Sequence, residues 1–362
     1  MGYPLILGWL GRRSAKPIEK RFAPRTVSFV MAVHNGENFL ADKLRSILAL
    51  DYPRELMEVV VVSDASTDST DDIARSFSAE GVKLIRVPRG GKPAALNVAV
   101  PETSGEILVL TDVRQTLERE SLRRMIACFG DSTVGVVSGD MVVRTGNIEE
   151  TNVGLYWRYE RWIRKQLGRV DSMMGATGPF YSIRRTLFRP MPKDLLLDDM
   201  YVPLGAFFQG YRLIVEEEAR AFDYPTGVET EFRRKVRTLA GNYQLLRYFP
   251  ELLSTRNRML FHYVSYKLAR LLLPWAVLAL FFVSFGLPSP AREAALVVQA
   301  LFYVLALTDL FAGPGTQWKR LSSPARTVVS LLAATACAVA IFFVPAQKLW
   351  KPTQIPAPRK RQ

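Results

Sequence analysis

Two acidic residues follow apolar runs in the first third of the chain. Asp64 comes just after Val59–Val62, and Asp112 comes just after Ile107–Leu110. A carboxylate in that place can accept a hydrogen bond from a nucleobase or ribose, or hold a divalent cation against a diphosphate. Either acid alone is as readily a helix cap or a turn residue. Two acids, each at the end of an apolar run, favour a nucleotide-diphosphate site.

An acidic pair, Asp198 and Asp199, marks a second position with possible chemistry. The pair opens the apolar helical pattern MYVPLGAFF, so one interpretation is a helix cap. The other is general base catalysis, because a hydroxyl nucleophile needs a nearby carboxylate to take its proton. We assign Asp199 as the base and Asp198 as the cap or orienting residue.

A basic helix face lies later in the chain. Arg234, Arg237 and Gly241 are spaced i, i+3 and i+7, so they share one face of a helix. An arginine-lined face can neutralise phosphate charge, and the alternative is an ordinary solvated basic face.

The elements that must position these residues alternate between strands and helices. Continuous apolar runs suit buried parallel strands. The strands are predicted at Val27–Val33, Val59–Val62, Lys83–Val87 and Ile107–Leu110, and the helices at Phe39–Leu50, after Ser69 or Thr70, and at Pro93–Val100. Four such units in about 85 residues predict an α/β fold with a doubly wound, mostly parallel sheet. Ligands bind such sheets beyond the carboxyl ends of the strands, where Asp64 and Asp112 fall.

Charge and cysteine content narrow the class of protein. The chain has 362 residues and a formal net charge of +14, and its basic residues cluster beside hydrophobic segments. Juxtamembrane flanks have this pattern, whereas a nucleic-acid surface gathers its charge into one stripe, so we expect no nucleic-acid partner. The two cysteines, Cys128 and Cys337, give neither a disulfide framework nor a zinc site, which fits a cytoplasmic soluble domain.

Three long apolar runs predict a membrane region. Leu271–Leu287, Ala294–Ala312 and Thr327–Val344 each approach the length of a spanning helix. The preceding segment Leu245–Lys267 mixes aromatic and basic residues, which suits amphipathic helices at the membrane interface or an ordinary globular helix. Met1–Leu10 is apolar but about half a span long, so it is predicted to be the end of a spanning helix or an interfacial anchor.

The number of crossings is open at this point. Three spans after a cytoplasmic domain would leave the basic tail outside, whereas the positive-inside tendency prefers it inside. One run is therefore predicted not to span, or to be re-entrant. The candidates for the run that does not span are the one that contains Asp309 and the short one that begins at Leu271.

Seven segments, taken in order, resemble family 2 glycosyltransferases with a GT-A fold. The likeness is strongest to the membrane polysaccharide-synthase branch, which includes cellulose, poly-N-acetylglucosamine and hyaluronan synthases, and it runs from about Val27 to the C-terminus. The segments are VSFVMAVHNGENFL, VVVSDASTDST, RGGKPAALNVAV, ILVLTDVRQ, ATGPFYSIRR, LLLDDMYVPLGAFFQGYR and FRRKVRTLAGNYQ.

The resemblance implies a binding role for residues at the strand ends. Asn35 and Glu37 would line a uridine pocket, and Asp64 would contact the uracil or ribose. Lys92 would lie near the ribose and diphosphate, where its charge suits a phosphate contact. Asp112 would hold Mg²⁺ or Mn²⁺ on the two phosphates.

The resemblance also implies the catalytic roles. Asp199 would be the general base beside Asp198, and Arg237 would help to neutralise the leaving diphosphate. Charge builds on that leaving oxygen, so a metal and nearby cations lower the barrier. With one base and no covalent nucleophile, attack is direct and the anomeric centre inverts.

The chain departs from the family pattern at several positions. Arg114 stands where the metal motif often has a second aspartate, so the site has one direct carboxylate or Arg114 itself touches the diphosphate. In the pattern of processive members, Arg234 replaces a glutamine and Thr238 replaces a tryptophan, while Arg237 matches. The lost tryptophan would be a stacking platform for the acceptor, which weakens the case for a polymerising enzyme. Leu197 replaces the threonine ahead of the acidic pair.

These observations predict an enzyme in five regions. They are an apolar and basic segment (1–24), a GT-A domain (25–244), interface helices (245–270), a membrane region of about three spans (271–347) and a basic tail (348–362). The predicted function is inverting transfer of a sugar from a UDP-sugar to a glycan or lipid acceptor, in cell-surface polysaccharide synthesis. The predicted setting is the lipid bilayer of the inner membrane, multi-pass, with the catalytic domain cytoplasmic.

Two other functions fit the same sequence. One is the addition of a single sugar to a lipid carrier. The other is a non-catalytic subunit that binds a nucleotide-sugar within a synthase complex, although the presence of Asp64, Asp112 and Asp199 argues against it.

Overall fold

The computed structural model describes residues 2–143, 155–223, 228–313 and 316–349. The contacts within the chain separate it into two compact units. Unit 1 contains residues 1–225 and the short segment Arg256–Met259, and unit 2 contains Thr226–Thr255 and the chain from Leu260 onward up to Gln354. The division at residue 225 differs from the predicted domain boundary at residue 244, because the helix that follows residue 227 packs on the apolar helices of unit 2.

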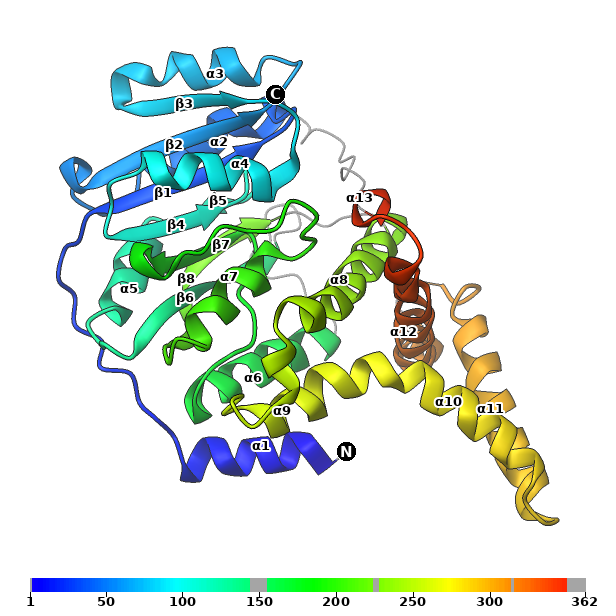
Figure 1. Ribbon diagram of the computed structural model, residues 1–362. Coiled ribbons are helices and arrows are strands. Elements are labelled where there is room, and N and C mark those ends of the chain that lie inside the picture. The colour runs from blue at the N-terminus through cyan, green and yellow to red at the C-terminus, as the bar shows by residue number, and fades with distance from the viewer. Residues whose placement is uncertain (1, 144–154, 224–227, 314–315, 350–362) are drawn as a thin grey trace. The chain divides into compact units, whose positions relative to one another are not determined.

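Unit 1 is built on one mixed sheet of eight strands, in the order β3-β2-β1-β4-β7-β6-β8-β5 (Figure 1). The strands β1 to β4 are parallel, as predicted, and β7 runs antiparallel to both of its neighbours. The second half of the sheet is therefore mixed. The strands are β1 (Val27–Val33), β2 (Met57–Asp64), β3 (Val82–Val87), β4 (Ile107–Thr111), β5 (Thr116–Leu117), β6 (Val134–Val143), β7 (Phe180–Arg184) and β8 (Arg212–Asp223).

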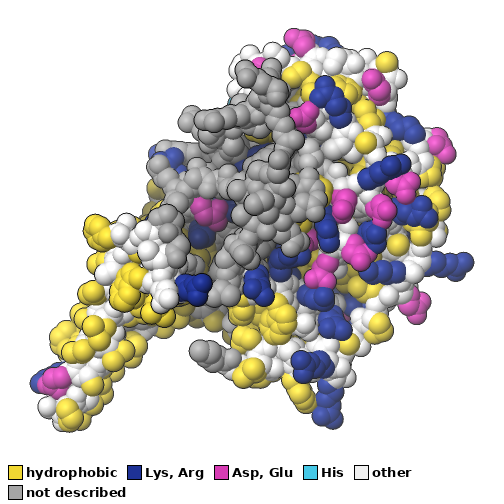
Figure 2. Space-filling view, turned by 180° about the vertical axis from the view of Figure 1, so that it is seen from behind, with side chains coloured by type: hydrophobic (Ala, Val, Ile, Leu, Met, Phe, Trp, Pro, Cys, Tyr) yellow, Lys and Arg dark blue, Asp and Glu magenta, His cyan; other side chains and the backbone are white. Residues whose placement is uncertain are grey.

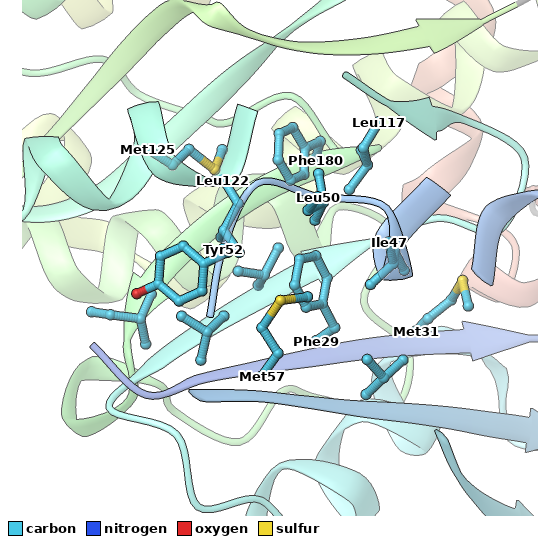
Figure 3. Packing of buried hydrophobic residues seen from close by; sticks show 14 of the residues in the cluster. Phe29, Met31, Ile47, Leu50, Tyr52, Met57, Leu117, Leu122, Met125 and Phe180 are labelled. Carbon is cyan, nitrogen blue, oxygen red and sulfur yellow. The ribbon is translucent and has the colours of Figure 1, made fainter. Parts of the chain in front are cut away.

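Helices cover the sheet and close its core. In Figure 3, Phe29 and Met31 of β1 pack with Met57 of β2, with Ile47 and with Phe180 of β7. Each fully buried apolar side chain of this kind stabilises the fold by about 1.5–3 kcal/mol relative to an exposed one. The helices of unit 1 are α1 (Gly2–Arg13), α2 (Glu37–Leu48), α3 (Thr70–Ser76), α4 (Gly91–Ala99), α5 (Ser121–Cys128), α6 (Leu155–Val170) and α7 (Asp198–Phe207).

Unit 2 consists of helices. Its first helix, α8, is followed by a short 3-10 turn at Pro250–Leu253, and α9 continues through a π-helical turn at Val264–Leu268 into α10. The predicted interface segment 245–270 therefore supplies the end of one helix and the beginning of another. The helices are α8 (Val228–Tyr248), α9 (Leu260–Tyr263), α10 (Ala269–Phe285), α11 (Ala291–Thr308), α12 (Gln317–Ala338) and α13 (Ala346–Leu349).

Three helices of unit 2 are long and apolar enough to cross a membrane, judged by length and composition. They are Leu260–Phe285, Ala291–Thr308 and Gln317–Phe342, and few of their side chains are buried. Figure 2 shows hydrophobic side chains along the α10–α11 hairpin, at its lower left, with charged side chains at the tip. An all-round apolar surface of this kind suits contact with lipid.

Candidate active site

The parallel half of the sheet brings the predicted site residues to one edge. Asp64 is the last residue of β2, and Asp112 follows the last residue of β4. Both strands lie beside β1 and run parallel to it, so their carboxyl ends meet at the same edge. The loop after β1, which carries Asn35 and Glu37, opens at that edge as well.

Asn35 and Glu37 hold the loop that follows β2. The Asn35 side-chain oxygen accepts a hydrogen bond from the Thr67 amide at 2.9 Å, and the Glu37 carboxylate accepts one from the Ser69 amide at 3.1 Å. In return, the Glu37 amide donates to the Asp68 carboxylate at 3.0 Å. Asn35 has a positive φ of 53°, a conformation that asparagine tolerates better than most residues. These contacts shape the two loops into one rigid rim.

The N-terminus of α3 is capped by a residue that precedes the N-cap position. Ser69 occupies the N-cap position, but its side chain makes no capping bond. Asp68 caps the helix instead, because its carboxylate accepts from the Thr70 amide at 3.0 Å. Its hydrogen bonds, Thr70 foremost, outweigh the effect of burial and lower the pKa of Asp68. Asp68 is therefore charged at neutral pH.

Asp64 fixes the glycine loop ahead of α4. Its buried carboxylate accepts hydrogen bonds from the Gly90 amide at 2.7 Å and the Gly91 amide at 3.0 Å, and it pairs with the Arg89 guanidinium. Gly91 has a φ of +81°, where a side chain would be strained. Lys92 is the second residue of α4, directly after Gly91, so Asp64 helps to set the position of that lysine.

Lys92 bridges two acids from distant parts of the chain. Its ammonium lies 2.8 Å from an Asp112 oxygen and 2.9 Å from an Asp198 oxygen. Burial acts to lower the pKa of Lys92, but the two carboxylates outweigh it and hold that pKa above the ordinary lysine value. The Asp112 side chain remains 39% exposed, so a ligand can reach it. The structure thus joins the two sites that the sequence identified separately.

Asp199 is held against a glycine. A Cβ atom at Gly178 would lie 2.8 Å from an Asp199 carboxylate oxygen, so any larger residue there would displace that carboxylate. The Asp199 carbonyl also accepts a hydrogen bond from the Ala176 amide at 2.7 Å. The segment Ala176–Gly178 therefore sets the position of the predicted base.

Tyr181 is a site residue that the sequence analysis missed. It lies fully buried on β7, and its hydroxyl has no hydrogen-bond partner among the described residues. Burial, and then the charges of Asp198, Asp199 and Asp112, raise the pKa of Tyr181 well above its ordinary value. The three carboxylates are therefore close enough to Tyr181 to favour its neutral form. Its signal in the sequence was a tyrosine beside Phe180 in a short strand that ends in Arg184.

Lys43 is a second missed residue. It is fully buried on α2, and its ammonium donates to the Thr111 hydroxyl at 2.7 Å and to the Gln115 carbonyl at 2.6 Å. Burial lowers the pKa of Lys43 to about 7, although the nearby Asp112 acts in the opposite direction. Lys43 therefore holds the segment Thr111–Gln115, which contains Asp112. Its signal was a charged residue at helical spacing from the apolar Leu40, Leu44 and Ile47.

Arg114 is engaged by an acid of β8. Its guanidinium pairs with the buried Asp223 carboxylate, which also accepts a hydrogen bond from the Gln115 side chain at 2.9 Å. This pairing ties the segment after β4 to the end of β8. The predicted contact of Arg114 with the diphosphate stays a prediction.

Arg234 and Arg237 lie on α8 of unit 2. Arg234 pairs with Glu231 at 2.7 Å, one turn away along the helix. The Arg237 Nε atom is buried and has no hydrogen-bond partner within the part of the chain that the structure describes. Their predicted role toward the leaving diphosphate stays a prediction.

The described residues contain no group of three or more His, Cys, Asp and Glu side chains placed to hold a metal ion. A metal at this site would therefore rest on Asp112 together with non-protein oxygens. Hard cations such as Mg²⁺ accept that arrangement, because they keep water and phosphate ligands beside one or two carboxylates. The half-exposed Asp112 carboxylate fits such a shared ion.

Comparisons with known proteins agree with this geometry. Residues 28–191 match the family described as Glycosyl transferase family 2. A probable glycosyltransferase, YdaM of Bacillus subtilis, is 26% identical over 254 residues, covering 65% of this chain and 60% of the relative. The beta-monoglucosyldiacylglycerol synthase of a Nostoc species is 27% identical over 41% of this chain and 34% of the relative. The poly-beta-1,6-N-acetyl-D-glucosamine synthase of Staphylococcus epidermidis is 22% identical over 72% of this chain and 64% of the relative.

The chain spans between 34% and 64% of the length of these three relatives. Among solved structures, the mannosyltransferase PcManGT from Pyrobaculum calidifontis, in complex with GDP-Man and Mn²⁺, superposes with a TM-score of 0.72 at 24% identity. The match covers 94% of this chain and 95% of that one, and it shows a common fold. Residues 28–191 therefore match the family 2 glycosyltransferases, and the chain has the GT-A fold.

Proposed function

We propose that this protein is an inverting glycosyltransferase that moves a sugar from a UDP-sugar to a glycan or lipid acceptor at the inner membrane. The observation that carries the proposal is the bridge formed by Lys92 between Asp112 and Asp198. It brings together a cation suited to phosphate, an exposed acid suited to a metal ion and one member of the acidic pair. Glycosyl transfer from a nucleoside-diphosphate sugar can use these three functions together.

The donor side of the proposed site is the edge of the parallel strands. The rim made by Asn35, Glu37 and the loop after β2 would hold the nucleoside, and Asp64 keeps the glycine loop in register with it. A bound Mg²⁺ or Mn²⁺ would neutralise the two phosphates and stabilise the charge that develops on the leaving oxygen. Lys92 adds a protein cation at the same place, and Asp112 offers the carboxylate for the ion.

The acceptor side is the start of α7. Asp198 forms an ion pair with Lys92. Its neighbour Asp199 is therefore the better candidate for taking the proton of the acceptor hydroxyl. No covalent nucleophile is part of the proposal. Direct attack by the acceptor oxygen breaks the bond between the anomeric carbon and the diphosphate oxygen, and the configuration inverts.

Two acceptor classes are in view, and the relatives represent both. One relative is named as a glycolipid synthase and another as a polysaccharide synthase. Thr238, in place of the tryptophan of processive enzymes, favours the addition of few sugars per acceptor. A radiolabelled-donor assay in membranes, with products separated by size, distinguishes a single-sugar glycolipid from a polymer.

The enzyme proposal is tested with purified protein and a panel of UDP-sugars. Release of UDP from at least one donor, abolished in Asp199→Asn, is the expected result. A protein that binds UDP-sugars but releases no UDP with any donor or acceptor would instead support the non-catalytic subunit. A GDP-sugar that turns over in place of every UDP-sugar would overturn the choice of nucleotide.

A further inference from the structure

The three apolar helices of unit 2 do not share one direction. α10 and α11 form an antiparallel hairpin, because the Gln299 side chain donates to the Ser284 hydroxyl at 2.9 Å across the turn. Thr308 follows Gln299 by nine residues, and nine residues before Ser284 is Trp275. The end of α11 therefore returns to the level of Trp275, near the beginning of α10.

The first turns of α12 are fixed to that end of α11. Asp309 is 2% exposed, and its carboxylate accepts hydrogen bonds from Ser322 at 2.7 Å, Ser323 at 3.0 Å and Arg326 at 3.1 Å. Lys319 donates to the Asp309 carbonyl at 3.3 Å. The start of α12 thus lies at the level of Trp275 and has a fully satisfied ionic anchor.

The far end of α12 is fixed near the same level. Tyr243 of α8 donates a hydrogen bond to the Leu271 carbonyl at 3.0 Å, and its ring meets the Phe342 ring with centroids 5.5 Å apart. Leu271 belongs to the first turn of α10. Phe342 therefore lies beside the beginning of α10, while the hairpin tip after Ser284 lies about 20 Å further along the helix.

The contacts that fix the two ends of α12, at Asp309 and at Tyr243, are incompatible with a third crossing. Ser322 and Phe342 are separated by 20 positions, and the helix between them is about 30 Å long. A crossing helix that starts at the end of α11 would have to finish level with the hairpin tip. The end of α12 lies instead beside the beginning of α10, so α12 runs across the hairpin. In Figure 1, α10 and α11 extend together beyond α12, which packs on both α8 and α11.

The surfaces of the helices show which of them enter the bilayer. The α10–α11 hairpin is apolar on all sides, with Leu280, Phe282 and Val298 more than half exposed, as a spanning hairpin requires. α12 buries its small residues Ala334 and Ala338 and packs on both α8 and α11, and its first turns carry Lys319, Arg320 and Arg326. α8 itself carries Arg233, Arg234, Lys235 and Arg237, which do not belong in hydrocarbon.

We infer that, among the described helices of unit 2, α10 and α11 cross the bilayer and α12 lies in the interface on the side where α10 begins. Two crossings return the chain to its starting side. Arg320 and Lys348 then share that side with the basic tail, whereas the hairpin tip carries only Arg292 beside Glu293. The positive-inside tendency makes the side of α12 cytoplasmic, and the conflict over the tail disappears.

Cysteine labelling of the full-length protein in membranes tests this arrangement. Cys337→Ala removes the exposed thiol of α12, and Cys128 stays because it is buried. Single cysteines are then placed at Glu293, Arg320 and Lys348 and treated with a membrane-impermeant maleimide, on spheroplasts and on inverted vesicles. Labelling in detergent is the control that each thiol can react.

The expected result is a tenfold or greater preference of Glu293→Cys for labelling from outside. Arg320→Cys and Lys348→Cys are expected to show the opposite preference. Labelling of Lys348→Cys from the same side as Glu293→Cys would establish a third crossing and overturn the inference. Labelling of all three from one side would overturn it too, because the hairpin would not cross.

A fusion gives the same answer without any change inside the helices. Green fluorescent protein fused after Gln362 is expected to fluoresce and alkaline phosphatase to be inactive, because the two fold on opposite sides of a bacterial inner membrane. The reverse pattern would overturn the inference. Neither readout depends on glycosyl transfer, so a failure of the inferred topology can be distinguished from a failure of the proposed function.

Discussion

Asp112 of unit 1 and Asp309 of unit 2 are both carboxylates paired with basic side chains, and they differ in access. Asp112 pairs with Lys92 and stays 39% exposed, whereas Asp309 accepts from two serines and an arginine and is 2% exposed. An exposed acid beside a cation can exchange that partner for a ligand. A sealed and fully bonded acid holds two helices together. Exposure and remaining bonding capacity therefore separate a candidate ligand site from a structural anchor.

The largest effect is expected at the proposed base. Asp199→Asn keeps the size of the side chain but cannot accept the acceptor proton, so turnover should fall by about 10²–10⁴-fold. UDP binding should change little, because Asp198 and Lys92 still make their pair. Turnover and UDP binding are measured side by side, with the exposed Asp42→Asn as the control. Unchanged turnover would remove Asp199 from the mechanism.

The second largest effect is expected on UDP binding, when the exposed Asp112 is replaced. In Asp112→Asn the proposed metal loses its protein carboxylate, so UDP binding in the presence of Mn²⁺ should weaken by about tenfold or more. The binding that remains should no longer respond to EDTA. Calorimetric titration of UDP with and without EDTA measures both. Binding that is equally strong in Asp112→Asn and equally insensitive to EDTA in both proteins would contradict the metal role.

A smaller effect is expected behind that acid, at Lys43. Lys43→Met leaves the Thr111 and Gln115 oxygens without this donor, which costs stability, but it also removes a buried ammonium, which relieves the cost of burying a charge. The Mn²⁺ concentration for half-maximal activity should rise by about tenfold, since ligand orientation depends on supporting contacts. At pH 7 these two effects on stability oppose each other, so the melting temperature should change little. Lys83→Met, which loses an exposed ion pair with Glu58, is the matched control.

The pH dependence of stability gives Lys43 a second readout. Its pKa is about 7 in the folded protein and its ordinary value is 10.5, so between these pH values the unfolded chain binds more protons than the folded chain. The stability of the wild type should therefore rise with pH across this window. Lys43→Met lacks that rise, so the difference in melting temperature between the two proteins should shift in favour of the wild type from pH 7 to pH 10. Parallel curves would contradict a depressed pKa.

The smallest effect on activity is expected at the sealed acid. Asp309→Asn keeps part of the bonding to Ser322 and Ser323 but loses the charge that faces Arg326. The melting temperature in detergent should fall by a few degrees, on the order expected for a loss of about 1–2 kcal/mol. The KM for the donor should stay unchanged. A raised KM with an unchanged melting temperature would reverse the contrast with Asp112.

The sequence by itself determined the parallel half of the sheet and the two strand-end acids. Buried parallel strands read as continuous apolar runs, and that signal is local, so Val27–Val33 and Ile107–Leu110 were found within one residue at either end. The rule that ligands lie beyond the strand ends then identified Asp64 and Asp112. Asp198 and Asp199 were found from the helical pattern that follows them.

Only the tertiary structure decided which of these residues meet. The pairs formed by Lys92 with Asp198 and by Arg114 with Asp223 join positions about 100 residues apart, and no local period encodes such a partner. In the sequence, Lys43 and Tyr181 are polar residues among apolar ones and carry no functional signal. Their link to the site appears only once the structure brings acidic residues near them. The direction of α12 depends in the same way on its two ends, because hydropathy measures how apolar a helix is and not where its ends are held.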